Sequence, residues 1–301
     1  MSPLSDYRGR FAPSPTGPLH FGSLVAALGS YLDAKHHRGK WLVRMEDLDT
    51  TRTVPGAADD ILRTLERLGL RWDEEIIYQS QRSETYMPAL QNLQRMNAVY
   101  PCTCTRKEIA DSALHGIDGQ IYPGTCRNGI PDEREGRAWR VITNKQTLKF
   151  NDALQGNISQ QLESEIGDFV VKRADGLFAY QLAVVVDDAH QEITHVVRGA
   201  DLLASTPRQI HLQQLLGLAT PQYLHLPVAI NVSGEKLSKQ TLAKPLDLNH
   251  ATLLLNEALK FLQQNPPAEL VHENIPAILQ WGIQNWDRNR LNRVMRTTHV
   301  S

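Results

Sequence analysis

Residues 10–23 read RFAPSPTGPLHFGS, and this stretch gives the strongest structural signal in the chain. Its two glycines and three prolines indicate a stiff loop between a predicted strand at 8–12 and a predicted helix at 21–36. A second apolar strand is predicted at 41–45, and apolar residues then recur at helical spacing from 58 to 68. This alternation of strands and helices predicts an α/β fold with a parallel sheet.

Local signals mark the ends of further elements. Gly39 is expected to end the first helix by adopting a left-handed conformation. Thr105 and Glu108 have the spacing of a capping box, so a short helix should begin just after Thr105. The pair at 175–176, Asp-Gly, predicts a hairpin turn, whereas the run QLAVVVDD at 181–188 is compatible with a strand or a helix.

Composition narrows the class of protein. The 301 residues are 41% hydrophobic and 22% charged, with 32 Lys+Arg against 33 Asp+Glu. These values are those of an ordinary globular chain and exclude disordered, collagen-like and disulfide-dependent small proteins. No stretch reaches the roughly 18 to 20 apolar residues that span a bilayer. We expect a soluble, cytoplasmic protein, and the balanced charge neither supports nor excludes RNA binding.

Changes in local sequence composition along the chain predict its domain organisation. Residues 1–98 should form the first half of a nucleotide-binding domain, and residues 166–245 the second half. Between them, residues 99–165 are rich in turn-forming sequence and are interpreted as an inserted subdomain. Residues 246–301 should form a short helical tail.

Two loops carry residues suited to phosphate chemistry. The loop at 10–23 leads directly into a helix, and a helix start offers backbone amides and a positive dipole to phosphates. His20 stands at that point, where an imidazole could donate to a phosphoryl oxygen. A second loop reads SGEKLSKQ, and its Lys236 and Lys239 could neutralise a triphosphate. The competing interpretations are a proline-rich turn and a solvated lysine loop.

The three cysteines, Cys102, Cys104 and Cys126, lie within one short region. An odd number of clustered thiols without a secretory signal indicates a metal site better than a disulfide framework. Tetrahedral zinc needs one further protein ligand, for which His115 is the chemically commoner candidate. The alternative is three unrelated buried thiols.

Several motifs together resemble one family of enzymes. HFGS at 20–23 and KLSKQ at 236–240 resemble the HIGH and KMSKS signatures of class I aminoacyl-tRNA synthetases. VRMEDLD at 43–49, YQLAVVVDD at 180–188 and HVVRGADLLASTPRQ at 195–209 resemble the catalytic domain of glutamyl-tRNA synthetases. The likeness runs from residue 8 to residue 244. Ser replaces the last His of HIGH, and Gln replaces the last Ser of KMSKS.

The resemblance implies a Rossmann-type catalytic domain with an inserted, zinc-containing acceptor-type subdomain, and it indicates Tyr122 as the fourth zinc ligand. Only residues 245–301 remain where the family has a large anticodon-binding portion. A shortened branch of the family has this outline, and its members activate L-glutamate with ATP and Mg²⁺ without tRNA. They then attach glutamate to the queuosine base in the anticodon of tRNA(Asp), and we expect the same activity here, from a monomer. The alternatives are a truncated synthetase that charges a tRNA 3′ end and an inactive paralogue that binds RNA or protein.

The matching motif positions imply individual site residues. His20 and Lys239 are the expected catalytic residues. In the glutamate pocket, Arg10 should pair with the side-chain carboxylate, Glu46 with the ammonium group and Arg198 with the α-carboxylate, assisted by Ser14 and Tyr180. The expected ATP-binding residues are Pro13, Thr16, Gly17, His20, Gly22, Ser23, Lys236, Ser238 and Lys239. For Arg44 and Asp47, which flank Glu46, we expect a surface or interdomain salt bridge.

Overall fold

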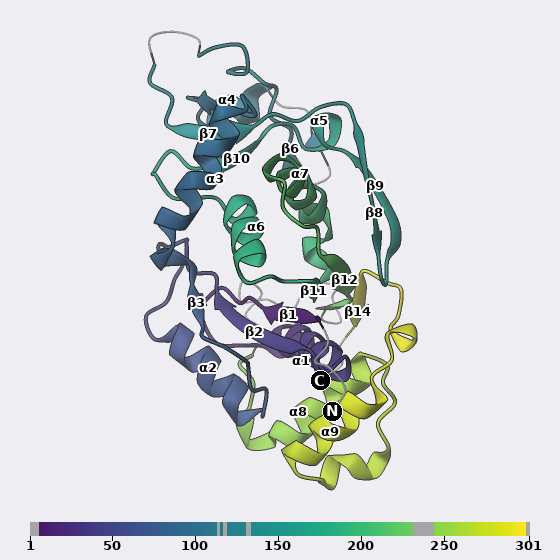
Figure 1. Ribbon diagram of the computed structural model, residues 1–301. Coiled ribbons are helices and arrows are strands. Elements are labelled where there is room, and N and C mark those ends of the chain that lie inside the picture. Colours follow the sequence, from purple (N-terminus) through teal and green to yellow (C-terminus); the bar gives the residue numbers. More distant parts are fainter. Residues whose placement is uncertain (1–5, 113–114, 117–118, 131–133, 231–243, 299–301) are drawn as a thin grey trace.

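The structure is a computed structural model that describes residues 6–112, 115–116, 119–130, 134–230 and 244–298 (Figure 1). Side chains are not described within 111–119 or at residue 298. The predicted KLSKQ loop therefore lies outside the described residues.

The amino-terminal part is a parallel α/β unit, as predicted. Its three-stranded sheet has the order β1-β2-β3, and both strand pairs are parallel. The predicted first helix has the bounds that the structure shows. The elements are β1 (Arg8–Phe11), α1 (Phe21–His36), β2 (Lys40–Met45), α2 (Ala57–Arg67) and β3 (Ile77–Tyr78).

Helix α1 is the central helix of this unit. The residues at its carboxyl end correct the prediction that Gly39 takes the left-handed conformation there. Arg38, with φ of 57°, takes the left-handed conformation expected of Gly39. Gly39 is required for a different reason, because a Cβ there would lie 2.3 Å from the Tyr7 carbonyl oxygen. The close approach of two backbone segments, rather than the helix cap, explains this glycine.

A second part of the chain, beginning at α6, repeats the α/β pattern. Helix α6 (Tyr180–His190) contains the run left open between strand and helix, and it is followed by β11 (His195–Gly199), α7 (Thr206–Leu216) and β12 (Gln222–Leu226). Strands β11 and β12 are parallel. The backbone N–H of Thr194 donates to the carbonyl of Arg8 at 3.0 Å, which joins this part to β1. Burial on several sides explains why the valines of α6 adopt a helix against their strand preference.

The region between the two parts forms a separate antiparallel sheet and a long hairpin. The sheet has the order β10-β7-β4, whereas the hairpin β8–β9 extends the sheet of β11 and β12. In Figure 1 the hairpin runs along one edge of the molecule from α5 to β12. The elements are α3 (Ser83–Arg95), β4 (Val99–Cys102), α4 (Arg106–Ser112), β5 (His115–Gly116), β6 (Gly119–Gln120), β7 (Ala138–Val141), β8 (Thr147–Asp152), β9 (Gly156–Gln161), α5 (Leu162–Glu165) and β10 (Phe169–Lys172).

Two local predictions in this region are confirmed. The backbone N–H of Thr105 donates to the Glu108 carboxylate at 2.7 Å, and the N–H of Glu108 donates to Thr105 Oγ1 at 3.2 Å, which is the capping box. At the Asp-Gly pair a hairpin turn forms, but residues 174–176 make up its loop instead of the expected two residues: Arg173 N–H donates to the Leu177 carbonyl at 2.8 Å and closes the turn. The second arm of that hairpin is a single bridge to Phe178, because α6 begins two residues later.

The tail is helical as predicted, and it also returns to the catalytic fold. Helices α8 (Ala251–Phe261) and α9 (Ile275–Asn285) pack against α1. Buried Asp33 of α1 accepts hydrogen bonds from Trp286, from Tyr7 and twice from Arg288. Beyond the predicted helices, β14 (Arg296–Thr298) pairs in parallel with β13 (Val228–Ile230). The boundaries of the four predicted segments stay a prediction.

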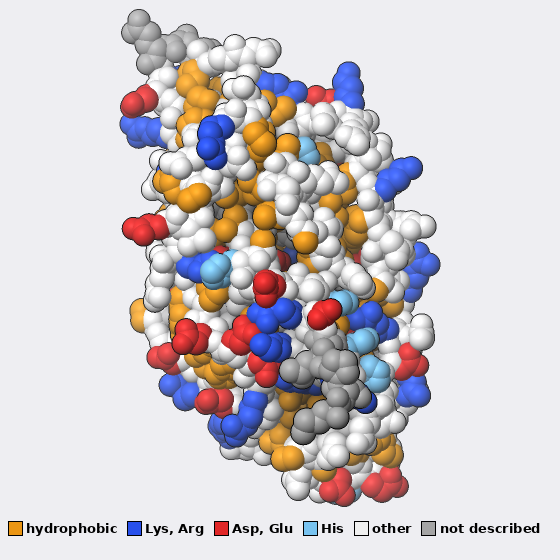
Figure 2. All heavy atoms as spheres, viewed as in Figure 1, with side chains coloured by type: hydrophobic (Ala, Val, Ile, Leu, Met, Phe, Trp, Pro, Cys, Tyr) orange, Lys and Arg blue, Asp and Glu red, His pale blue; other side chains and the backbone are white. Residues whose placement is uncertain are grey.

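The surface mixes both signs of charge. On the face shown in Figure 2, acidic and basic side chains are interspersed over the lower half, and more apolar surface is exposed above them. Within the described ranges, the chain forms no helix both long and apolar enough to cross a bilayer.

Candidate active site

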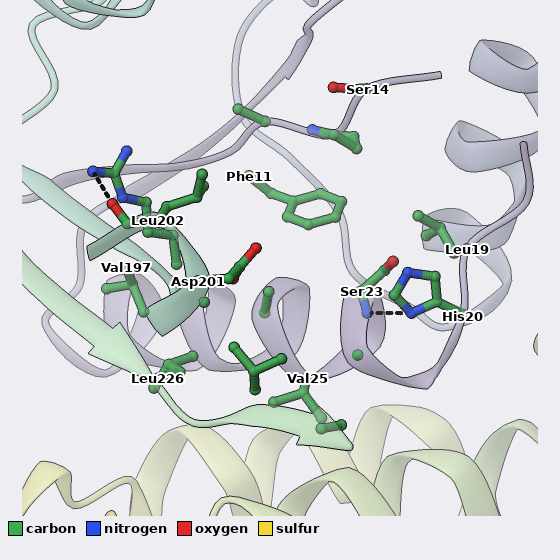
Figure 3. Close-up of a pocket in the computed structure, with 18 of the residues that line it drawn as sticks. Phe11, Ser14, Leu19, His20, Ser23, Val25, Val197, Asp201, Leu202 and Leu226 are labelled. Atoms are coloured by element: carbon green, nitrogen blue, oxygen red, sulfur yellow. Dashed lines mark hydrogen bonds between the residues drawn. The ribbon is translucent and has the colours of Figure 1, made fainter. Parts of the chain in front are cut away.

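A cavity of about 440 Å³ lies where the loop before α1 meets the ends of β11 and β12. All five residues predicted to bind glutamate line it, together with five of the residues predicted to bind ATP. In Figure 3, His20 and Ser23 lie on one side of the cavity and Val197 and Leu202 on the other, with Phe11 and Asp201 between them. The predicted residues that line it are Arg10, Pro13, Ser14, Thr16, His20, Gly22, Ser23, Glu46, Tyr180 and Arg198.

Arg10 lines the cavity, and an acidic residue of α6 holds its side chain in place. Its Nε donates to the Asp188 carboxylate at 3.2 Å, and the Arg10 side chain is 4% exposed. Arg44 donates to the same carboxylate oxygen at 2.8 Å. Burial opposes ionisation of Asp188, but the positive charges of Arg10 and Arg44 hold its pKa below the usual range. Asp188 therefore fixes two guanidinium groups while remaining charged itself.

Arg44 corrects the expectation of a surface or interdomain ion pair. Its side chain is fully buried, and it donates to Gln191 at 2.7 Å as well as to Asp188. Asp47 accepts from the backbone and hydroxyl of Ser80 at 2.8 and 2.6 Å. The neighbouring charged residues thus have separate roles, because β2 turns Arg44 into the core and leaves Asp47 toward solvent.

Glu46, a carboxylate of the cavity wall, is less completely paired than Asp188. The nearest guanidinium nitrogen, Nη2 of Arg44, lies 3.5 Å from it, at the outer limit of a hydrogen bond. Burial raises the pKa of Glu46 above its usual value, against the opposing charges of Arg44 and Arg10. A cationic group placed in the cavity would stabilise the ionised form of Glu46.

Arg198 stands at the other side of the cavity and is held by several partners. Its Nη1 donates to the Tyr180 hydroxyl at 3.3 Å, and its Nη2 donates to Thr206 at 2.8 Å and to Gln209 at 2.9 Å. Its Nε donates to Nε2 of His225 at 3.0 Å. The guanidinium is thus fixed in one orientation before any ligand arrives.

His20 is the N-cap of α1. Its Nδ1 accepts a hydrogen bond from the backbone N–H of Ser23 at 3.2 Å. In a neutral ring this places the proton on Nε2, which is then a donor. The cap occupies the Ser23 amide, which is one of the backbone N–H groups at the helix start that were expected to face a phosphate.

The remaining predicted residues fall in two groups. Gly17 belongs to the same loop, with φ of 137°, but is not part of the cavity wall. Lys236, Ser238 and Lys239 lie outside the described residues. Asp201 lines the cavity and was not selected from the sequence, and neither was Asp188. Two consecutive carboxylates ending an apolar run, as at 187–188, are the signal that could have identified Asp188, because buried carboxylates need partners.

The three cysteine thiols and Tyr122 form a second cluster. The sulfur atoms all lie within 4.8 Å of one another, and the Sγ atoms of Cys104 and Cys126 are 3.6 Å apart. The Tyr122 hydroxyl oxygen is 3.4 Å from Sγ of both Cys102 and Cys104. Tetrahedral zinc requires sulfur–sulfur separations of about 3.8 Å and oxygen–sulfur separations of about 3.5 Å, so these donors fit a zinc ion. The side chain of the alternative ligand, His115, lies outside the described part.

Comparison with known proteins places the chain in a family. Residues 6–252 match the family described as tRNA synthetases class I (E and Q), catalytic domain. The chain is 60% identical over 284 residues to the glutamyl-Q tRNA(Asp) synthetase of Dechloromonas aromatica, covering 94% of each chain. It is 56% identical over 285 residues to the protein of that name from Chromobacterium violaceum, covering 95% of each.

A solved structure shares the fold at lower sequence identity. The crystal structure of a glutamate tRNA ligase from Elizabethkingia meningosepticum, in complex with its amino acid, superposes with a TM-score of 0.80 at 24% identity. The superposition covers 96% of this chain and 66% of that enzyme. The match over residues 6–252 and the identity to full-length relatives lead to one conclusion: this chain belongs to the catalytic-domain family of the class I (E and Q) tRNA synthetases.

Proposed function

We propose that this protein activates L-glutamate with ATP and Mg²⁺ and attaches it to the queuosine base in the anticodon of tRNA(Asp). The observation that carries the proposal is the cavity beside α1, where Arg10, Arg198 and Glu46 converge next to the His20 cap. The relatives that match almost the whole chain are named for this activity.

The cavity offers one group for each charge of glutamate. Arg198, with the Tyr180 hydroxyl, would bind the α-carboxylate, and Arg10 would bind the side-chain carboxylate. Among the described residues, Asp188 engages only Nε of Arg10, so both Nη groups remain for the substrate. Glu46 would bind the ammonium group, because Asp188 already pairs with two guanidinium groups.

In the first step an oxygen of the glutamate α-carboxylate attacks the α-phosphorus of ATP, and pyrophosphate leaves. His20 would donate from Nε2 to a phosphoryl oxygen whose charge grows in the transition state. Pro13, Thr16, Gly17, Gly22 and Ser23 would surround the nucleotide. Lys239 and Lys236 would neutralise the departing phosphates, and the Ser238 hydroxyl would donate a hydrogen bond to them. Mg²⁺ enters with ATP as part of the substrate.

In the second step a hydroxyl of the cyclopentene diol of queuosine attacks the carbonyl carbon of glutamyl adenylate. The ester forms, AMP leaves and the hydroxyl proton passes to solvent. A vicinal diol in an anticodon loop presents the same chemistry as a terminal ribose, and splayed loop bases are accessible to a compact protein. No covalent enzyme intermediate is required.

Two assays test the proposal. Glutamate-dependent ATP–pyrophosphate exchange should proceed without tRNA, and His20→Ala should slow it by roughly a hundredfold. Radiolabelled glutamate should be transferred to tRNA(Asp) that carries queuosine but not to an unmodified transcript. Label on the transcript or on the terminal adenosine would favour a truncated synthetase. Complete absence of exchange would favour an inactive paralogue.

We also propose that Cys102, Cys104, Cys126 and Tyr122 hold one structural zinc ion. Four protein ligands leave no coordination position for a substrate, so the ion would stabilise the inserted region only. Elemental analysis should find about one zinc per chain. Tyr122→Phe should weaken zinc retention whereas His115→Ala should not, and the reverse result would make His115 the ligand.

The proposal includes a cytoplasmic monomer. ATP and tRNA are cytoplasmic substrates, and one chain supplies every described group of the cavity. Sedimentation of the purified protein at assay concentration should give a single species of about the chain mass, 33.9 kDa.

A further inference from the structure

A buried chain of hydrogen bonds runs from the inserted hairpin to the cavity. Asp152, the last residue of β8, contacts Nδ1 of His225 with Oδ2 at 2.6 Å, and both side chains are completely buried. Nε2 of His225 in turn lies 3.0 Å from Nε of Arg198. The Thr206 hydroxyl, which accepts from Arg198, is 3.1 Å from the same Nε2.

The contacts fix the tautomer of the imidazole. Arg198 Nε can only donate, so Nε2 of His225 must accept and carries no proton. The proton of the neutral ring therefore lies on Nδ1 and points at the Asp152 carboxylate. Oδ1 of Asp152 has a different task, because it accepts the backbone N–H groups of Leu154 and Gln155 at 3.0 and 2.8 Å. Oδ1 also accepts the backbone N–H of His225 at 3.3 Å, so it holds the turn and the His225 backbone while Oδ2 orients the imidazole.

We propose that Asp152 and His225 are positioning residues for amino-acid binding: the carboxylate sets the imidazole tautomer, and the imidazole aims the Arg198 guanidinium at the substrate carboxylate. This inference rests on the proposed function, in which Arg198 binds glutamate. It assigns the β8–β9 hairpin a part in the amino-acid pocket, although the hairpin belongs to the inserted region and contributes no residue to the cavity wall.

Asp152→Asn is the sharpest perturbation. The amide retains an oxygen for the turn, but its nitrogen donates toward Nδ1 of His225. The imidazole proton must then move to Nε2, where it faces the N–H of Arg198. His225→Leu removes the acceptor altogether. His225→Gln is the conservative variant, because its amide can accept from Arg198 and donate to Asp152.

The readout is steady-state ATP–pyrophosphate exchange with glutamate and ATP varied separately. We expect Asp152→Asn and His225→Leu to raise KM for glutamate by roughly 10- to 100-fold, the scale of a lost hydrogen bond to a charged group. KM for ATP should change by less than about twofold, and His225→Gln should recover most of the glutamate affinity. Because both residues act through one contact, the double variant Asp152→Asn/His225→Leu should be no worse than His225→Leu alone.

The matched control is Asp247→Asn. Asp247 and His250 form the same kind of pair at 2.9 Å, but they are exposed and neither residue lines the cavity. This variant should keep both KM values. An unchanged KM for glutamate in His225→Leu, or a parallel rise of both KM values that His225→Gln does not reverse, would overturn the positioning role. Lack of glutamate-dependent exchange in the unaltered protein would instead refute the proposed function.

Discussion

Asp188→Asn should show whether the carboxylate between Arg10 and Arg44 is required for stability as well as for substrate binding. The substitution preserves volume and one acceptor but removes the charge that both guanidinium groups share. The contacts of 3.2 and 2.8 Å join side chains that are at most 7% exposed, so solvent cannot replace the lost interaction. Removing one partner of a buried pair typically costs 3–5 kcal/mol, and the retained acceptor places our expectation at about 3 kcal/mol.

Urea unfolding at neutral pH measures this loss, and the pH dependence gives an independent check. The pKa of Asp188 is held below its usual range, so its contribution is present above about pH 4 and is lost as the pH falls through the lowered pKa. The difference between the variant and the unaltered protein should therefore shrink in acid. KM for glutamate should rise by roughly tenfold, because Arg10 loses its anchor.

The control is the same substitution in an exposed ion pair. Asp175 contacts Arg173 at 2.6 Å, with side chains 47% and 36% exposed, so Asp175→Asn should cost about 0.5 kcal/mol or less. Equal stability of Asp175→Asn and Asp188→Asn at neutral pH would refute the reasoning. A loss that persists unchanged in acid would show that packing, and not charge, is responsible.

Three further expectations follow from the other buried contacts. Glu46→Gln should lower the rate of glutamate-dependent exchange by roughly a hundredfold. The same variant should have a higher thermal midpoint at neutral pH, because burial raises the pKa of Glu46 and its ionised form destabilises the folded state. This gain in thermal midpoint should disappear as the pH falls below the raised pKa. Arg140→Met should weaken zinc retention by roughly tenfold in chelator competition, because Arg140 donates to Cys102 Sγ at 3.3 Å. Arg288→Met should lower the free energy of unfolding by about 2 kcal/mol in urea, less than for a fully buried pair, because Arg288 is 26% exposed against Asp33.

Sequence reasoning predicted the features that depend on local order. The α/β pattern, the bounds of α1 and the capping box follow from periodicity and from residues a few positions apart. The motif positions also identified residues that meet in one cavity. These residues lie in β1 or in the loop after it, directly after β2, at the start of α6 and in β11. Local spacing predicted the wrong role for Gly39: the glycine is required by the close approach of a distant backbone segment, not by the end of the helix.

Partnerships between distant residues could not be predicted in this way. Asp152 and His225 are 73 positions apart, and Arg44 and Asp188 are 144 apart. No charge pattern specifies which of 33 acidic residues will face a given arginine. The pairing of β14 with β13 cannot be predicted from the sequence either, because three residues carry too little periodicity to indicate a strand.

The buried charges beside the cavity are better explained by the substrate than by stability. Desolvation offsets most of the attraction in a buried ion pair, and well-packed apolar residues commonly stabilise a core equally well. Arg10, Arg44 and Asp188 nevertheless form such a cluster next to a cavity, and Glu46 remains poorly paired beside them. In a core selected for stability alone, Glu46 would have a full set of partners or would be replaced by another residue. Under the proposed function, an ammonium group in the cavity would supply this missing partner, and the guanidinium groups of Arg10 and Arg198 would select a molecule with two carboxylates.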